Sequence, residues 1–366
     1  MTAFSEKDIL FMREALKLAN AAKGKTFPNP AVGAVIVSEG KIVGKGATQV
    51  YGGPHAEKIA LKDAGSKANG ATLYVTLEPC CHYGRTPPCT DAIVAAGIKK
   101  VVLSVKDPNP LVAGRGIRQL RSMGIIVNSG LLRKDALELN EDFFFSIVAK
   151  RAWVTLKLAL TLDGMIADES GGSKWITGEK ARLCVQEQRR IHAAIAVGKS
   201  TLNHDNPQLT IRHKSGYNPA RIIFSSSKEI PRNTYFFQHR NETRSIVVIS
   251  GGIPWTISRE SGIEYWYTGE ADEKVQLTTF LKMAFAQNIP SIFIEGGQIV
   301  ASKFLENGLV NRLHLFYGQK ILGGGKKSFA FKKGMPINNS IILNNTRHQI
   351  LDGDILVSGT PEIVST

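Results

Sequence analysis

The sequence predicts an α/β protein of two domains joined near residue 150. In the first part of the chain, short apolar strands alternate with helical stretches, and histidine and cysteine residues gather among them. A helical connector follows, and at Trp153 the pattern restarts with a continuous apolar run typical of buried parallel strands. At 366 residues the chain is long enough to form two separate cores. We therefore expect residues 1–149 and 150–366 to form the two domains.

The first domain is expected to contain a sheet with helices on its faces. Ser5 and Asp8 have the spacing of a helix capping box, and apolar residues then recur at helical spacing. The remaining elements are a hairpin of strands 31–37 and 41–47, helix 55–67, strand 71–77, helix 90–96, strand 99–105, helix 116–123 and strand 125–127. The helical connector Leu131–Ala149 carries phenylalanines at 143–145, which we expect to pack between the domains.

The second domain is expected to be a doubly wound α/β domain. Its apolar strands alternate with helical stretches, which indicates a parallel sheet covered by helices on both faces. After Trp153 the expected strands are 193–198, 221–226, 245–250, 291–296 and 313–318. Gly296 and Gly297 lie between a strand and a helix, where backbone amides can hold a phosphate.

One stretch of the first domain has the residues of a catalytic zinc site. His55, Cys80 and Cys89 supply one imidazole and two thiolates, which can hold a tetrahedral Zn²⁺ and leave its fourth position for water. Zinc lowers the pKa of such a water to roughly 7, and Glu57 is placed to move its protons. The H-x-E and P-C pattern is typical of zinc nucleobase deaminases. A sheet with ligands at helix starts also matches the cytidine-deaminase fold.

Two alternatives stay open from the residues alone. The loop between Cys80 and Cys89 is longer than in the general deaminase signature, so Cys81 is a rival ligand. We favour Cys80 and Cys89 because each follows a proline. A purely structural zinc site is the second alternative, and the carboxylate of Glu57 argues against it. Three of the four cysteines lie close together, which indicates metal binding and not a disulfide framework.

The composition is ordinary for a globular protein, apart from an excess of basic residues. The net charge is +15, but the excess is spread over both halves without a basic tail or an aromatic-interleaved stripe. We therefore expect no nucleic-acid partner, and we assign part of the charge to phosphorylated ligands. No stretch is long and apolar enough to span a membrane, and the N-terminus does not resemble a signal peptide. We expect no membrane partner and a cytoplasmic location.

Nine motifs follow one another along nearly the whole chain: PNPAVGAVIV, HAE, TLEPCCHYGRTPPC, DPNPLVAGRGI, LKLALTLDGMIA, SKWITG, HDNPQLTIR, IEGG and KILGGG. In this order they resemble the RibD family of bifunctional riboflavin-biosynthesis enzymes. The resemblance implies a cytidine-deaminase-like three-layer domain followed by a dihydrofolate-reductase-like α/β domain. It implies zinc-dependent deamination of 2,5-diamino-6-(5-phosphoribosylamino)pyrimidin-4(3H)-one. It also implies that NADPH then reduces the ribosyl chain of 5-amino-6-(5-phosphoribosylamino)uracil to ribityl. We also expect a homo-oligomer, either a dimer or a tetramer.

The resemblance implies binding roles for residues whose motifs match. The deaminase substrate contacts are Asn29, His82 and Arg85. Arg85 suits a phosphate, because its planar guanidinium offers several donors. The NADPH contacts are Ala159, Trp175, Thr201, Asp205, Ser226, Gly297, Gln298, Ile299, Val300, Ala301, Ser302 and Lys303. The reductase substrate contacts are Ser173, Arg189, Leu209, Arg212 and Glu295. The two arginines are expected to face the 5′-phosphate.

Some positions depart from the family pattern, and other functions compete with it. Met165, Gln319 and the serines of RIIFSSS stand where we expect a basic residue, a proline and an acid. Asp163 is expected to have a structural role in a turn, and no acid–base residue for hydride transfer stands out. The main alternative is a zinc deaminase that acts on RNA or a nucleoside and carries a C-terminal binding domain. A nucleic-acid-binding module with structural zinc is another, and the motifs after Trp153 argue against both.

Overall fold

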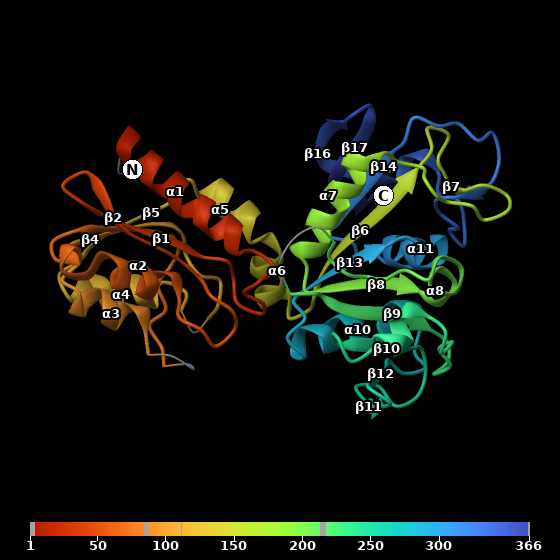
Figure 1. The fold of residues 1–366 in the computed structure, drawn as a ribbon, viewed down its shortest axis with the longest axis horizontal. Coiled ribbons are helices and arrows are strands. Elements are labelled where there is room, and N and C mark those ends of the chain that lie inside the picture. The colour runs from red at the N-terminus through yellow and green to blue at the C-terminus, as the bar shows by residue number, and fades with distance from the viewer. Residues whose placement is uncertain (1–3, 84–86, 111, 213–216, 365–366) are drawn as a thin grey trace. The chain divides into compact units, whose positions relative to one another are not determined.

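Each of the two units of the chain, Met1–Lys150 and Arg151–Thr366, is built on its own β-sheet (Figure 1). The computed structural model describes residues 4–83, 87–110, 112–212 and 217–364. The strands and helices expected in both halves are present, and their ends differ from the prediction by a few residues at most. Among the described residues, no helix is long and apolar enough to cross a membrane.

The first unit has a five-stranded sheet in the order β2-β1-β3-β4-β5, in which β1 runs antiparallel to β2 and β3. Its elements are α1 (Glu6–Ala22), β1 (Gly33–Ser38), β2 (Lys41–Ala47), α2 (Ala56–Ala64), the 3₁₀ turn Gly65–Ala68, β3 (Thr72–Leu77), α3 (Cys89–Ala95), β4 (Lys100–Val105), α4 (Arg115–Ser122), β5 (Ile126–Ser129), α5 (Arg133–Leu139) and α6 (Glu141–Ala149). Ser5 and Asp8 form the predicted capping box of α1. In α6, Phe143 and Phe144 pack against the core of this same unit.

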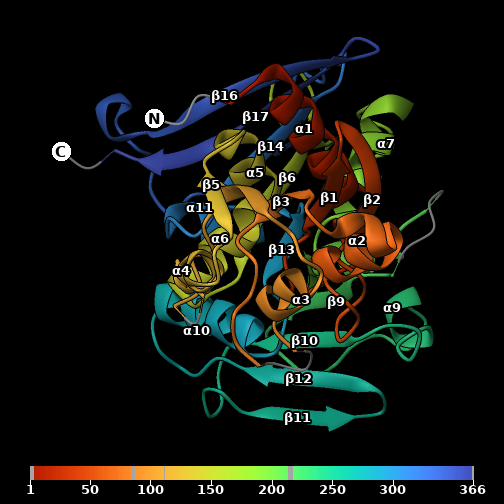
Figure 2. The same cartoon turned by 90° about the vertical axis from the view of Figure 1, so that its left-hand side faces the viewer.

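Alternating side chains of this sheet are buried on both faces, so the unit has three layers. On one face Val35, Val37 and Tyr74 pack with Met12 and Ala15 of α1. On the other face the sheet packs against α2, α3 and α4 through Ala34, Ile36, Leu73, Val75, Ala56, Ala60, Ile93, Ile117 and Leu120. Figures 1 and 2 show α1 on one side of the sheet and α2 and α3 on the other. This is the three-layer arrangement that the sequence predicts.

The second unit has a ten-stranded sheet in the order β11-β12-β10-β9-β8-β13-β6-β14-β17-β16. The strands from β12 to β14 run parallel, and β11, β17 and β16 are antiparallel additions at the edges. Its elements are β6 (Trp153–Leu160), β7 (Met165–Ala167), α7 (Glu179–Arg190), β8 (Ala194–Gly198), α8 (Lys199–Asp205), β9 (Ala220–Ser225), α9 (Tyr235–Gln238), β10 (Ser245–Ile249), β11 (Ile257–Glu260), β12 (Ile263–Tyr267), α10 (Glu273–Ala286), β13 (Ser291–Glu295), α11 (Gln298–Glu306), β14 (Arg312–Tyr317), β15 (Lys326–Lys327), the 3₁₀ turn Ile337–Asn339, β16 (Ile341–Leu351) and β17 (Asp354–Ile363).

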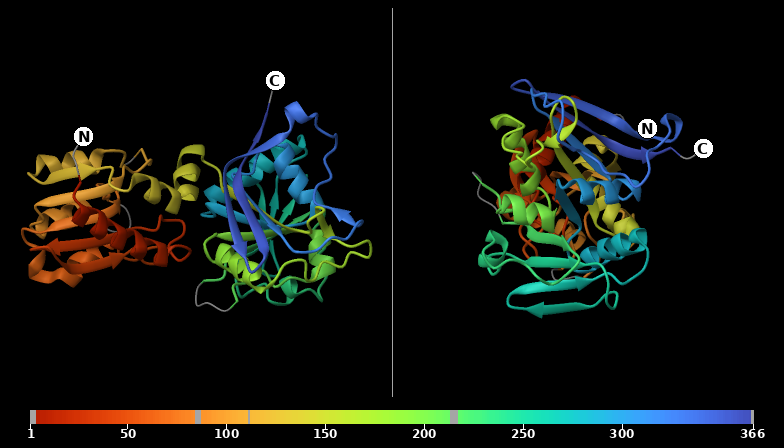
Figure 3. Two further views of the ribbon diagram at one scale, coloured as in Figure 1. Left: turned by 90° about the horizontal axis from the view of Figure 1, so that it is seen from above. Right: turned by 90° about the vertical axis from the view of Figure 1, so that its right-hand side faces the viewer.

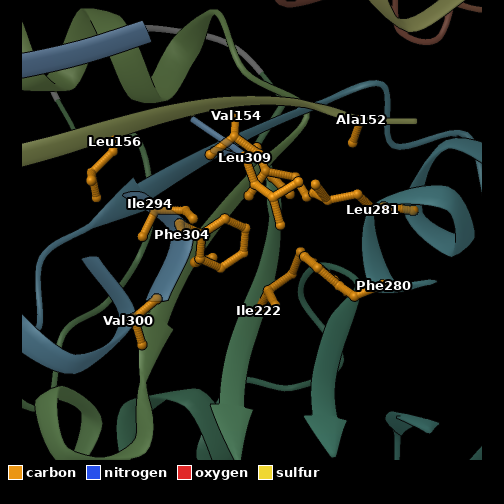
Figure 4. Close-up of a cluster of buried hydrophobic side chains, with 14 of the residues drawn as sticks. Ala152, Val154, Leu156, Ile222, Phe280, Leu281, Ile294, Val300, Phe304 and Leu309 are labelled. Carbon is orange, nitrogen blue, oxygen red and sulfur yellow. The ribbon is translucent and has the colours of Figure 1, made fainter. Parts of the chain in front are cut away.

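Helices cover both faces of this sheet, as expected for a doubly wound domain. Phe280 of α10 and Phe304 of α11 belong to the core on one face, together with Ile222 and Ile294 of the strands (Figure 4). On the other face the helices α7, α8 and α9 contribute Ala181, Val185, Leu202 and Phe236, which pack with Ile195, Val197, Ile223, Phe293 and Phe316. The apolar strands are therefore buried on both sides, which explains their continuous hydrophobic runs.

The sequence does not predict the two antiparallel strand pairs β11–β12 and β16–β17. Figure 3 shows them at opposite edges of the large sheet. The centre of β16 reads NNTRHQ and is largely exposed, so it lacks the apolar alternation by which a strand is recognised.

Asp163 has the structural role that the sequence predicts. Its carboxylate accepts hydrogen bonds from the backbone N–H groups of Leu322 and Gly323, at 2.7 Å for Gly323, and from the Thr161 hydroxyl at 2.6 Å. The LDG motif is thereby joined to KILGGG, far along the chain.

His314 on β14 is a buried histidine whose protonation should destabilise the second unit. Burial lowers its pKa to about 3, and its Nδ1 atom has no hydrogen-bond partner among the described residues. Between about pH 6.5 and 3 the unfolded chain binds a proton that the folded chain does not. Stability therefore falls as the pH falls through this window, by up to ~1.4 kcal/mol per pH unit.

We expect His314→Leu to remove the part of the pH dependence of stability that comes from this histidine. The loss of unfolding free energy between pH 7 and pH 5 should be about 2 kcal/mol smaller in the variant than in the wild type. Urea unfolding of both proteins at the two pH values measures the difference. Equal losses would show that His314 does not contribute to acid sensitivity.

Candidate active sites

The start of α2 carries two residues of a polar cluster in the first unit. His55 is the N-cap residue of α2, and Glu57 lies in its first turn with a buried side chain. The helix packs closely on β2 because that strand has glycines at the contact. A Cβ at Gly46 would lie 2.1 Å from the Ala56 carbonyl oxygen, closer than any real contact. A larger residue at Gly46 would therefore displace His55 and Glu57.

Cys80 and Cys89 complete the cluster from the loop after β3 and from the first residue of α3. The Nδ1 atom of His55 lies 3.5 Å from Cys80 Sγ and 3.3 Å from Cys89 Sγ, and the candidate ligand atoms of the three residues lie within 4.8 Å of one another. The backbone N–H of Cys89 donates to Cys80 Sγ at 3.3 Å. One imidazole nitrogen and two sulfurs at these separations fit Zn²⁺, whose bonds to such ligands are ~2.0–2.3 Å long. Cys81 lies outside the group.

The charges of this cluster depend on one another. A hydrogen bond with Cys89 lowers the pKa of Cys80 to about 4, and His55 adds to the effect. A hydrogen bond with Cys80 raises the pKa of His55. Burial raises the pKa of Glu57 to about 7, and the charge of Cys80 acts in the same direction. The cluster thus holds a thiolate, an imidazole and a buried carboxyl group next to one another.

The buried carboxylate of Glu78 connects the cysteine loop to the loop after β4. The sequence alone does not single out this residue. The oxygens of Glu78 accept backbone N–H groups at 3.2, 2.9 and 3.1 Å from Asp107, Gly114 and Ile117. Asp107 is itself largely buried, which raises the pKa of its carboxyl group to about 6. Both acids lie within quoted motifs, TLEPCC and DPNP, but nothing local in those motifs shows that the two loops meet.

Two of the residues expected to bind the deaminase substrate, Asn29 and His82, lie in loops of the described structure. Asn29 lies in the turn before β1. Two residues further on, the Ala31 N–H donates to the side-chain oxygen of Asn140 at 3.0 Å, and the side-chain N–H of Asn140 donates to the Ala31 carbonyl oxygen at 2.9 Å. His82 lies in the cysteine loop, and its Nδ1 is buried without a hydrogen-bond partner among the described residues. Arg85 lies outside the described residues.

A cavity of about 640 Å³ lies at the carboxyl ends of the central strands of the second unit. This volume suits a small organic ligand or part of a dinucleotide. Its lining includes many of the residues expected to bind cofactor or substrate: Ala159, Ser173, Trp175, Arg189, Thr201, Asp205, Leu209, Arg212, Glu295 and Gly297. Ser226 and residues 298–303 do not line it. The chain thus brings together residues from four of the quoted motifs, with Arg189 and Thr201 from outside them.

The polar centre of this cavity is a buried ion pair. Arg189 donates from Nε and Nη2 to the two oxygens of Glu295, with an Nη2–Oε2 distance of 2.8 Å, and from Nη1 to the Thr210 carbonyl oxygen at 3.0 Å. Burial alone would raise the pKa of Glu295, but the Arg189 charge outweighs it and holds the pKa below its usual range. Because its guanidinium is engaged in this way, Arg189 is less available to a phosphate than the exposed Arg212.

Lys157 is a further polar residue of the cavity that the sequence analysis does not assign. It lies on β6, and burial lowers the pKa of its ammonium group while the charge of Glu295 acts in the opposite direction. The sequence signal was present: Lys157 is the single charged residue in the apolar run VTLKLAL.

The turn between β13 and α11 has the geometry of a phosphate-binding loop. Gly296 and Gly297 have φ values of 68° and 83°, which favour glycine. A Cβ at Gly297 would lie 3.1 Å from Thr201 Oγ1, so a larger residue would crowd the space between the two chain segments. The glycines therefore leave a cradle beside backbone N–H groups, which fits a dinucleotide phosphate.

The residues of α11 that follow this turn are mostly engaged within the protein. The side chains of Val300 and Ala301 are buried in the core, Ser302 donates to the Gln298 carbonyl oxygen at 2.7 Å, and Lys303 pairs with a glutamate of α10 at 2.8 Å. Ile299 is exposed. A cofactor contact from this segment would therefore be made by the backbone of its first turn.

The two folds and their sites define the class of the chain as a zinc deaminase joined to an α/β domain with a nucleotide-sized cavity. Residues 5–105 match the family described as the cytidine and deoxycytidylate deaminase zinc-binding region, and residues 152–357 match the RibD C-terminal domain. The chain belongs to the RibD family.

Relatives of this family match over almost the whole length of the chain. The riboflavin biosynthesis protein RibD of Actinobacillus pleuropneumoniae is 40% identical, with 96% of this chain and 94% of the relative covered. The RibD of Aquifex aeolicus is 43% identical, with 87% and 89% covered.

Solved structures agree with the fold. The diaminohydroxyphosphoribosylaminopyrimidine deaminase/5-amino-6-(5-phosphoribosylamino)uracil reductase of Thermotoga maritima has a TM-score of 0.84 at 37% identity and covers 97% of this chain and 99% of its own. Acinetobacter baumannii RibD has a TM-score of 0.85 at 35% identity, with 98% and 99% covered.

The geometry of the cysteine cluster predicts which thiol binds metal. Cys80→Ser should lose most of the bound zinc, because it removes a sulfur that contacts both His55 and Cys89. Cys81→Ser, the matched variant one residue along, should keep zinc close to one equivalent per chain. Metal analysis of both purified proteins checks this. Zinc lost from the Cys81 variant and retained by the Cys80 variant would reverse the ligand assignment.

Proposed function

We infer that this protein catalyses two steps of riboflavin biosynthesis, a zinc-dependent deamination and an NADPH-dependent reduction. The first step deaminates 2,5-diamino-6-(5-phosphoribosylamino)pyrimidin-4(3H)-one. The second reduces the ribosyl chain of 5-amino-6-(5-phosphoribosylamino)uracil to ribityl. The observation that carries this inference is the presence in one chain of the His55–Cys80–Cys89 cluster with Glu57 and of the cavity around Glu295. The Thermotoga maritima relative is named for both activities.

In the first unit we assign His55, Cys80 and Cys89 as zinc ligands and Glu57 as the proton carrier. Bound zinc supplies a Lewis acid that makes hydroxide available near neutral pH. Glu57, buried against the cluster, accepts a proton from water, delivers it to a ring nitrogen and then assists the departure of ammonia. The water supplies the oxygen that replaces the amine. Asn29, His82 and Arg85 are assigned to substrate binding.

In the second unit we assign the cavity to the substrate and to the reactive half of NADPH. NADPH supplies the hydride when bound. Ser173, Arg189, Leu209, Arg212 and Glu295 are assigned to the substrate, with Arg212 as the main partner of the 5′-phosphate. Ala159, Trp175, Thr201, Asp205, Ser226 and the 297–303 segment are assigned to the cofactor. Reduction also needs a proton, and we assign its delivery to Lys157, which lines the cavity and interacts with Glu295.

The relatives do not favour a deaminase of RNA or nucleosides with a C-terminal binding domain, because they match both halves of the chain. The absence of a nucleic-acid partner stays a prediction, supported by the even spread of the +15 charge. A homo-oligomeric state and a cytoplasmic location also stay predictions, which light scattering and cell fractionation would test.

Two assays on one preparation test the proposed function. Ammonia release from the diaminopyrimidinone substrate without NADPH reports the first step. NADPH oxidation with the deaminated compound reports the second. Deamination of RNA or a nucleoside, with no NADPH oxidation, would favour the alternative.

Glu57→Gln keeps the size and polarity of the side chain but cannot carry protons near neutral pH. We expect deamination to fall by at least ~10²-fold, as is usual when a general acid–base is lost. Zinc content and reduction of the deaminated substrate should not change. Glu39→Gln, in the exposed β1–β2 turn, is the matched control and should behave as wild type. Near-normal ammonia release by the Glu57 variant would remove the role assigned to it.

Arg212→Ala tests whether the two units, joined near residue 150, act independently. A phosphate would lose a charge-assisted partner, so reduction should fall about 10- to 150-fold if the contact persists in the transition state. Deamination should be unchanged, because its residues all lie in the first unit. Arg232→Ala, an exposed arginine outside the cavity, is the matched control. A matched fall in both rates, with zinc intact, would indicate one shared site.

A further inference from the structure

We propose that Asn140 and Lys23 are positioning residues for deamination, which hold the segment 23–31 so that Asn29 can contact the substrate. The inference rests on the deaminase function proposed above and deepens it. Neither residue belongs to the zinc cluster or to the substrate contacts assigned so far. We call residues 23–31 the Asn29 segment.

The register of the small sheet places the Asn29 segment beside the zinc cluster. β1 runs antiparallel to both β2 and β3, and Gly33 at its start pairs with Ala47 at the end of β2. From there the chain continues to His55, and from the end of β3 it continues to Cys80. The residues just before β1 therefore lie at the edge of the sheet from which both ligands extend.

A turn within the segment presents the side chain of Asn29. The Asn29 N–H donates to the Thr26 carbonyl oxygen at 2.9 Å, and the Thr26 hydroxyl donates to the Asn29 carbonyl oxygen at 2.9 Å. Thr26 and Ala31 are buried, whereas Asn29 is only partly buried. Because the turn engages the backbone of Asn29, a ligand at this edge would meet its side-chain amide.

Asn140 fixes the segment at the end that leads into β1. Its two hydrogen bonds with the N–H and the carbonyl oxygen of Ala31 copy the exchange between paired residues of neighbouring antiparallel strands. The residue is 5% exposed, so loss of its side chain would leave a buried N–H and a buried carbonyl group without these partners. Ala31 is two residues from Asn29, so this contact limits where the Asn29 side chain can lie.

Lys23 fixes the opposite end of the segment to the same place. Its Nζ atom donates to the Leu139 carbonyl oxygen and forms an ion pair with Asp142 at 3.0 Å. The two side chains of the ion pair are 12% and 9% exposed, so water screens the pair little. α5 ends at Leu139 and α6 begins after Asn140. The junction of these two helices therefore holds the Asn29 segment at both ends, with Asn29 between the two anchors.

Steady-state deamination by the zinc-loaded full chain tests the proposal. Asn140→Ala and Asn29→Ala should each raise KM for the diaminopyrimidinone roughly three- to tenfold, the effect of about one hydrogen bond, and leave kcat within about twofold. The double variant should be no worse than Asn29→Ala alone, because Asn140 acts through Asn29. Zinc content and reduction should not change. Asn69→Ala, an exposed residue before β3 at the opposite edge of the sheet, is the control and should behave as wild type.

Two changes at the other anchor test the proposal independently, and they decide it if Asn140→Ala does not fold. Lys23→Met combined with Asp142→Leu removes the ion pair without leaving a buried charge. This variant should also raise KM without loss of zinc. Lys23→Arg keeps the charge and should keep the wild-type KM.

The double variant separates positioning from a general structural effect. Losses that multiply in Asn29→Ala/Asn140→Ala would mean that Asn140 does not act through Asn29, and they would overturn the proposal. A wild-type KM in Asn29→Ala, in a folded Asn140→Ala or in the variant without the ion pair would overturn it as well. These results would leave the deaminase function standing. A wild-type enzyme that releases no ammonia from the diaminopyrimidinone would instead contradict the proposed function.

Discussion

Parallel strands have one edge at which their carboxyl ends, the following loops and the starts of helices all meet, and both candidate sites of this protein lie at such an edge. In the first unit β3 leads into Cys80, and in the second β13 leads into Glu295 and Gly296. A side chain at this edge meets residues from other strands that lie far away in sequence. His55 and Cys89 reach the first site from helices that begin beside the end of β3. The chemistry therefore depends on the sheets being paired in this register.

Burial of charge is the second condition that both sites share. Removing a carboxylate from water is unfavourable unless hydrogen bonds or a counter-charge replace the solvent. Glu78 is compensated by backbone N–H groups, and Glu295 by the guanidinium of Arg189. Glu57 has less compensation, which is why its pKa rises whereas that of Glu295 falls. A pKa near neutrality suits the proton-carrying role proposed for Glu57, whereas Glu295 stays ionised beside Arg189.

Close packing through glycine brings the site segments within reach of one another. A Cβ at Gly116 would lie 2.2 Å from the Pro79 carbonyl oxygen, so α4 and the cysteine loop meet only because residue 116 has no side chain. A Cβ at Gly318 would lie 1.9 Å from the Ile176 carbonyl oxygen, close to the Trp175 segment of the cavity. Such contacts cannot be recognised from a glycine alone, because most glycines in a sequence serve turns.

The sequence by itself determined the first unit's elements, the central strands of the second unit and the identity of the metal donors. The elements can be recognised from local features: the period-two and period-3.6 patterns, the Ser5 capping box and the apolar run after Trp153. The H-x-E motif with two Pro-Cys pairs is likewise local, and it indicates a zinc deaminase site. Only the tertiary structure decided that Arg189 is engaged by Glu295, that Glu78 holds a distant loop, that Lys157 faces the cavity and that Lys199 meets Ser227. The same holds for β16, whose polar sequence becomes a strand by pairing with β17. The physical reason is common to all five: each depends on a partner far away in the chain, and local spacing carries no information about which distant group will compensate a charge or complete a hydrogen bond.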